Sequence, residues 1–168
     1  LLAERKEVAL SLSAYASRLE TLVRQDVEKQ RAITSGRVEF IVTSTLIGAY
    51  AGGVVIDLTD IEDVRLGVAT VMLTTGGALT GAIFGTRNKG IRAAEGSAYT
   101  IGALWGGATS VLVLGIVGPQ NDDLAVLTVF GSVAGSGLGS FFLTREVGAT
   151  AGQVSIVGNG AFMGFSTS

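Results

Sequence analysis

The sequence predicts an all-α membrane protein, because its composition is apolar, its apolar runs are long and its glycines are regularly spaced. Hydrophobic residues make up 48% of the 168 residues and charged residues only 15%, well below the roughly 25% of soluble domains. Glycine recurs at every fourth position within the apolar runs. Residues four apart share one face of a helix, and a glycine face lets a second backbone approach closely in lipid. We therefore expect an N-terminal amphipathic helix followed by a Gly-zipper bundle of four to five transmembrane helices.

Residues 1–34 carry most of the charge in the first part of the chain and are expected to form the amphipathic helix. Their apolar residues step by four and three, as in a heptad pattern, at Val8, Leu12, Tyr15, Leu19 and Leu22. This helix would lie on its own bundle or on the membrane surface, or it would act as an oligomerising stalk. A break is predicted between Ile33 and Arg37, since Thr34 or Ser35 could cap the next helix.

Residues 35–168 are predicted to form the membrane bundle. The apolar runs cover 38–56, 66–86, 97–117 and 124–144, with a weaker fifth run at 150–165. The first four are each close to the ~20 residues that a bilayer core requires. The glycines expected to pack helices together are Gly48, Gly52, Gly77, Gly81, Gly85, Gly102, Gly106, Gly131, Gly135 and Gly139.

An internal repeat is visible in these runs. The stretch IGAYAGG at 47–53 resembles IGALWGG at 101–107, and three helix entries look alike, TSGR at 34–37, AEGS at 94–97 and TAGQ at 150–153. The pattern predicts helical hairpins at about 35–90 and 91–146 and a partial third at 147–168, stacked as an array. The incomplete last unit suggests a continuing chain, a partner that completes it, or an oligomer that closes on itself.

The connectors between the runs alternate in charge. The segments before the first run and at 87–96 are basic, whereas those at 57–65 and 118–123 are acidic. Helices that cross a membrane in alternating directions would produce this pattern. The positive-inside rule then places residues 1–37 and 87–96 in the cytoplasm, if the membrane is an inner membrane.

Few residues could carry chemistry. The chain has no Cys and no His, which removes thiolate nucleophiles and the commonest general base. No nucleotide-binding glycine loop and no EF-hand spacing are present, so we expect no cofactor and no metal. Glu39, Gln153 and Asn159 are the candidates for a polar or ion site, because a carboxylate or amide within a membrane is costly. For Glu39 the first turn of a helix near water is the favoured interpretation. The alternatives are an ion or proton site and an inter-helix ion pair with Arg37 or Arg87.

The expected function is non-enzymatic. The chain is interpreted as an integral membrane domain, a structural or pore-lining subunit of an oligomer, with the lipid bilayer and further copies or other membrane subunits as partners and no nucleic acid. One alternative is a small transporter or ion channel acting as a unit. The other is a soluble or fibrous glycine-rich β protein, and Asn159-Gly160 would suit a hairpin turn.

Overall fold

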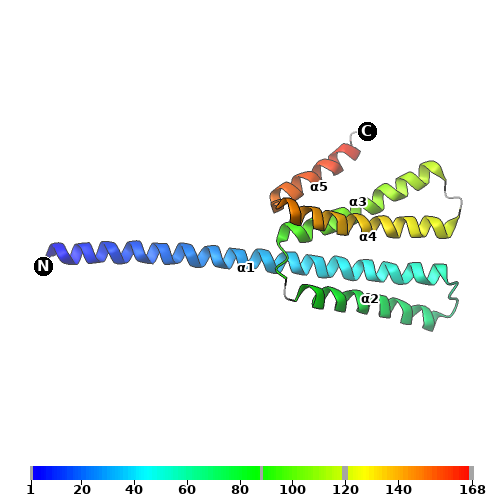
Figure 1. Ribbon diagram of the computed structural model, residues 1–168, viewed down its shortest axis with the longest axis horizontal. Helices are drawn as coiled ribbons and strands as arrows, with labels where there is room; N and C mark the ends of the chain where they lie inside the picture. The colour runs from blue at the N-terminus through cyan, green and yellow to red at the C-terminus, as the bar shows by residue number, and fades with distance from the viewer. Residues whose placement is uncertain (1, 88, 119–120, 167–168) are drawn as a thin grey trace.

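A computed structural model describes residues 2–87, 89–118 and 121–166, and every element in these ranges is an α-helix. The helices are α1 (Leu2–Leu58), α2 (Val64–Thr86), α3 (Ala93–Val117), α4 (Asp122–Val147) and α5 (Ala151–Ser166). They form a bundle from which the first half of α1 extends as a single long rod (Figure 1). The prediction of an all-helical chain is confirmed over the described residues. The described residues contain no β-strand, so they do not support the alternative of a β-rich protein. The hairpin turn suggested for Asn159-Gly160 lies inside α5.

The break predicted between Ile33 and Arg37 is wrong, because α1 runs through this segment without interruption. The hydroxyl of Thr34 donates to the carbonyl of Gln30 at 2.9 Å, within the same helix, and so caps nothing. A single interior glycine costs a helix only about 1 kcal/mol, which is too little to end it. The charged N-terminal segment and the first apolar run are therefore one element.

Two antiparallel helix pairs form the bundle. In the first pair α2 packs against α1, and in the second α4 packs against α3. The pairs meet mainly through α1 and α3, and α5 packs against α3. Contact between α2 and α4 is absent from the described part of the chain, although both touch α1.

Short polar connectors with specific caps join the helices. Asp63 caps α2 by accepting hydrogen bonds from the backbone N–H groups of Arg65 and Leu66. Asn121 caps α4 through the N–H of Asp123. Gly148 ends α4 in the left-handed conformation, with φ of 71°, which glycine adopts without strain. The caps satisfy helix-end groups at the turns between antiparallel neighbours.

Four of the helices are long and apolar enough to cross a membrane, in agreement with the sequence-based expectation of an integral membrane protein. The qualifying segments are Ser17–Leu58, Val64–Thr86, Ala93–Val117 and Asp122–Val147. Their large apolar side chains face outward, with Leu73 78% and Ile116 85% exposed. Many buried positions hold small or polar residues such as Ala98 and Thr86, and the larger buried side chains of Ile91, Tyr99 and Phe141 form one cluster. Most of the large apolar side chains are therefore on the outside of the bundle.

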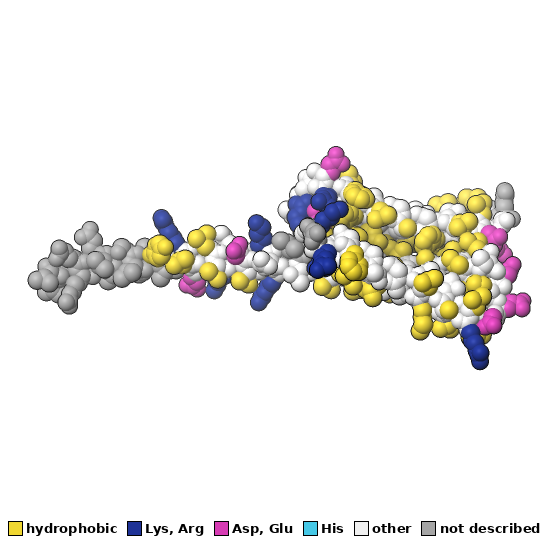
Figure 2. All heavy atoms as spheres, turned by 60° about the horizontal axis from the view of Figure 1, so that its bottom comes forward, with side chains coloured by type: hydrophobic (Ala, Val, Ile, Leu, Met, Phe, Trp, Pro, Cys, Tyr) yellow, Lys and Arg dark blue, Asp and Glu magenta, His cyan; other side chains and the backbone are white. Residues whose placement is uncertain are grey.

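The charges gather at the two ends of the bundle. Acidic side chains dominate the end that holds the connector at 59–63 and the start of α4, while basic side chains dominate the end from which α1 extends (Figure 2). Apolar side chains cover the surface between them (Figure 2). The alternation of connector charge in the sequence thus becomes a separation of charge along the bundle axis.

Candidate helix-packing faces and polar groove

The contact between α1 and α2 is built on two glycines of α1. A Cβ added at Gly48 would lie 2.9 Å from the carbonyl oxygen of Thr74 and would also meet the side chain of Ala78. A Cβ at Gly52 would lie 2.5 Å from the hydroxyl of Thr74 and 2.8 Å from Cα of Val71. These glycines therefore let the backbone of α2 approach more closely than any side chain would allow.

The contact between α3 and α4 has the same construction. A Cβ at Gly102 would lie 2.6 Å from the carbonyl oxygen of Ser136, and one at Gly106 would meet Ser132 and Ser136. The hydroxyl of Ser136 donates to the carbonyl of Gly102 at 2.7 Å, so the close approach also supplies an interhelical hydrogen bond. Ser140 lies across from Gly102 in the position that Ala78 holds across from Gly48.

The other predicted packing glycines have no such neighbour. Around an added Cβ there is no atom of another element within 4 Å at Gly77, Gly81, Gly85, Gly131, Gly135 and Gly139. All six are on α2 and α4, the second helices of the two pairs. Their faces are open in the single chain.

A third close contact, between α1 and α3, was not identified from glycine spacing. A Cβ at Gly96 would lie 2.5 Å from the carbonyl oxygen of Gly36, and one at Gly36 would meet the backbone of Arg92. Both glycines belong to the similar segments at 34–37 and 94–97. This similarity is the sequence feature from which the contact could have been predicted. Next to them, Glu95 is buried and accepts hydrogen bonds at 3.0 Å from the backbone N–H and from Nε of Arg92, which fixes the start of α3.

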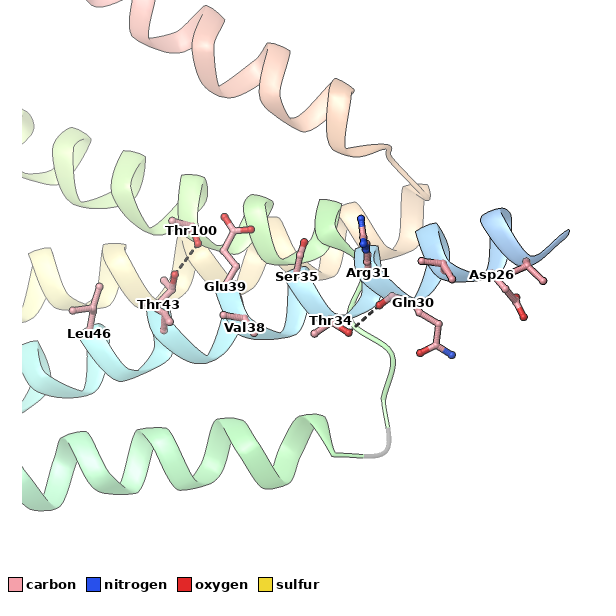
Figure 3. Close-up of a pocket in the computed structure, with 13 residues that line it drawn as sticks. Asp26, Gln30, Arg31, Thr34, Ser35, Val38, Glu39, Thr43, Leu46 and Thr100 are labelled. Carbon is pink, nitrogen blue, oxygen red and sulfur yellow. Dashed lines mark hydrogen bonds between the residues drawn. The ribbon is translucent and has the colours of Figure 1, made fainter. Parts of the chain in front are cut away.

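Polar side chains also link α1 to α3. Ser97 donates to Glu39 Oε2 at 2.8 Å, and the hydroxyls of Thr43 and Thr100 are hydrogen-bonded at 2.7 Å. Figure 3 shows Glu39 pointing from α1 toward α3, with the Thr43–Thr100 pair one turn further along. Interhelical hydrogen bonds of this kind contribute roughly 0.6 kcal/mol each within membranes.

The first-turn interpretation of Glu39 is wrong. Because α1 is continuous, Glu39 lies far from the first turn, and the helix dipole acts only near the ends. The alternative ion pairs are not formed either, since Arg37 donates instead to Thr86 Oγ1 at 3.1 Å and Glu39 accepts from Ser97. Glu39 is therefore a half-buried carboxylate that accepts a hydrogen bond from the hydroxyl of Ser97.

Glu39 and Asn159 line the same groove, of about 510 Å³, between α1, α3 and α5. Ser97 and Ser155 add hydroxyls to its lining, and the amide of Asn159 donates to Ser155 at 3.4 Å. Gln153, the third predicted polar residue, does not line it. Its Oε1 accepts from the N–H of Thr150 at 2.9 Å and so caps α5.

Carboxylate, hydroxyl and amide groups in one groove can bind a proton or a hard cation or can hydrogen-bond a polar ligand. The part of the chain that the structure describes contains no cluster of three or more metal-ligating side chains. Comparison of the chain with models of protein families, with curated proteins and with solved structures finds no match.

Proposed function

We propose that this chain is a non-enzymatic, integral membrane domain, built from repeated Gly-zipper hairpins, that serves as a structural subunit of a homo-oligomeric assembly. The observation that carries the proposal is the placement of the glycines. Of the ten predicted packing glycines, the four on α1 and α3 face a partner helix inside the chain, whereas the six on α2 and α4 are left open. Small-residue faces of this kind are what membrane helices use to associate.

The two helix pairs support the repeat. Each pair places two glycines against a hydroxyl residue and a small residue one turn apart, and the corresponding sets are Gly48, Gly52, Thr74 and Ala78 in the first pair and Gly102, Gly106, Ser136 and Ser140 in the second. In addition, α5 packs on α3 as the beginning of a third unit would. An array grows by burying such faces against its neighbours.

The open stripe on α4 is the proposed contact with a second copy. Gly131, Gly135 and Gly139 are exposed, while Ser132, Ser136 and Ser140 of the same helix turn toward α3. Outward-facing apolar neighbours such as Phe142, 60% exposed, flank the stripe. A helix of another subunit could pack closely on these glycines, as α2 packs on the glycines of α1.

Cysteine cross-linking tests this contact, because the native chain contains no Cys. We expect Gly135→Cys to form a disulfide-linked dimer in native membranes under mild oxidation, since equivalent faces meet in a symmetric contact. Gly53→Cys is the matched control, because Gly53 is equally open but belongs to α1. Cross-linking of Gly53→Cys with none of Gly135→Cys would contradict the proposed face.

The charge separation supports an orientation in the membrane. With the basic end and the N-terminal rod in the cytoplasm, the bundle follows the positive-inside rule for an inner membrane. The acidic connector at 59–63 and the acidic first turn of α4, with Asp122 and Asp123, would then face the opposite side. The bilayer itself is thus the partner of the exposed apolar surface.

A small channel or transporter is the second candidate, favoured by the groove that Glu39 shares with Asn159. Ion flux into vesicles reconstituted with the purified protein tests it. Flux that Glu39→Gln abolishes would support transport and would argue against a purely structural role. Gln153→Ala is a suitable control, because Gln153 caps α5 and does not line this groove.

A further inference from the structure

A second groove, distinct from the one at Glu39, runs along the bundle between α2 and α4. Its volume is about 680 Å³. Its floor is α1, through residues such as Phe40 and Ile47, and its walls are the glycine edge of α2 and the aromatic edge of α4. It stays open because α2 and α4 do not contact one another in the described part of the chain. The three glycines of the proposed oligomer contact on α4 do not line this groove, although Phe142, which flanks them, does.

The groove has a charged end. Lys89, just after α2, and Arg145, in the last turn of α4, both line it. Neither side chain has an ion pair or hydrogen bond in the described part of the chain, and this end of the bundle is the basic one (Figure 2). Arg37 reaches the same end of α2 through its bond to Thr86, which also lines the groove. The rest of the lining is mostly apolar or glycine.

The distribution of charge along the groove favours an occupant with an anionic head and a long apolar tail. The wall on α4 extends from Phe130 to Arg145, which is about 22 Å at 1.5 Å per residue. Lys89 and Arg145 lie at one end of this length, and mostly apolar or glycine residues line the rest. An extended acyl chain can lie along a groove of this length with its head group at the basic end.

We propose that this groove binds an anionic phospholipid of the bilayer. One acyl chain lies along Gly77, Gly81 and Gly85, and the phosphate is held between Lys89 and Arg145 at the membrane surface. Basic pockets between transmembrane helices recognise anionic head groups in this way. The inference rests on the proposed membrane location of the bundle.

Native mass spectrometry of the protein in detergent, with added lipid, tests the site. Phosphatidylglycerol and phosphatidylcholine with identical acyl chains are the probes. We expect wild-type protein to retain phosphatidylglycerol preferentially, and the Lys89→Gln/Arg145→Gln double variant to bind it roughly tenfold more weakly or worse. The control double variant Arg24→Gln/Arg65→Gln removes the same charge from exposed positions outside the groove and is expected to bind as wild type does.

A second variant tests the acyl-chain half of the site without changing charge. Gly81 lines the groove, and a Cβ added there would have no atom of another element within 4 Å. The leucine side chain of Gly81→Leu is therefore expected to occupy part of the groove and displace the lipid. Gly76→Leu, also open but not lining the groove, is expected to leave binding unchanged. Circular dichroism of each variant verifies that the helices are intact.

Equal retention of both lipids, or retention unaffected by the Lys89 and Arg145 changes, would overturn the site. A change of oligomeric state in Gly81→Leu with lipid retention unchanged would also overturn it, because the groove would then hold a second chain. Displacement of the bound lipid by inorganic phosphate alone would show an ion site without an acyl chain. Release of the wild-type protein from membranes by alkaline carbonate would instead reject the membrane location, independently of these lipid measurements.

Discussion

Gly102 and Gly115 lie on the same helix, but only one of them has a neighbour across an interface. A Cβ at Gly102 would lie 2.6 Å from a backbone oxygen of α4, which cannot rotate away, whereas Gly115 has open space around it. The structural role of a glycine is therefore set by the atom opposite to it. Its spacing in the sequence does not reveal that atom.

Replacement of these two glycines by alanine separates packing from helix propensity. Gly102→Ala should destabilise the bundle by about 1–3 kcal/mol, the usual cost of forcing an atom into a filled interface. Gly115→Ala gains helix propensity without a clash and should not destabilise it. Unfolding in detergent micelles with increasing dodecyl sulfate, followed by circular dichroism, measures both. Equal stabilities of the two variants would contradict the close contact between α3 and α4.

The sequence identifies the polar candidates within the apolar runs, but it does not show which of them lie close together in the structure. Hydropathy identified Glu39 as a carboxylate in an apolar run, yet its partner Ser97 is 58 residues away, and no local pattern indicates that pairing. Gln153 was grouped with Asn159 because both are polar residues in one run. In the structure the Gln153 side chain turns back to cap α5, so only Asn159 joins Glu39.

The helices themselves were predictable because apolar length is a direct requirement of the bilayer. The register in which the paired helices pack against one another was harder to predict. Sequence similarity aligns Gly77 and Gly81 of α2 with Gly135 and Gly139 of α4. In the structure, however, the residues of α4 that contact α3 in the way that Thr74 and Ala78 contact α1 are Ser136 and Ser140. These two serines lie one helical turn further along α4 than the sequence alignment would place them. Register depends on the whole interface, and adjacent turns of a glycine-rich helix present almost equivalent surfaces.

The continuity of α1 shows how weak a local helix-ending signal can be. Thr34, Ser35 and Gly36 looked like a cap and a break, but no proline removes a backbone hydrogen bond there. Gly36 instead allows the start of α3 to pack closely against α1, because a side chain there would meet the backbone of Arg92. The rod therefore continues into the bundle as one helix.

Spin labels can measure this rigidity in the protein without interference from native cysteine. Labels at Glu28→Cys and Gly53→Cys, both exposed, should give a single narrow distance of about 38 Å, the length of 25 helical residues. A pair within the bundle, Val38→Cys and Gly53→Cys, serves as the control at about 22 Å. A broad distribution with a shorter mean for the first pair alone would show that α1 bends between residues 33 and 37.

The whole molecule is organised by one axis, with charged ends and an apolar surface between them. Burying a charged side chain at the centre of a bilayer costs about 2.5–3.5 kcal/mol on insertion scales, so both charged ends must lie in water. The helices α1 to α4 connect these ends alternately. In the proposed membrane location, one bilayer position would therefore keep both ends in water.

This arrangement predicts which residues are accessible from each side of the membrane. Cysteines at Glu62 and Asp123, in the acidic end, should react with a membrane-impermeant maleimide from one side of sealed vesicles, and cysteines at Glu28 and Arg87 should react only from the other. All four residues are exposed, so differences in labelling report the side of the membrane and not burial. Labelling after detergent permeabilisation gives the full signal for each. Reaction of Glu62→Cys and Arg87→Cys from the same side would mean that α2 does not cross, because these residues lie at opposite ends of that helix.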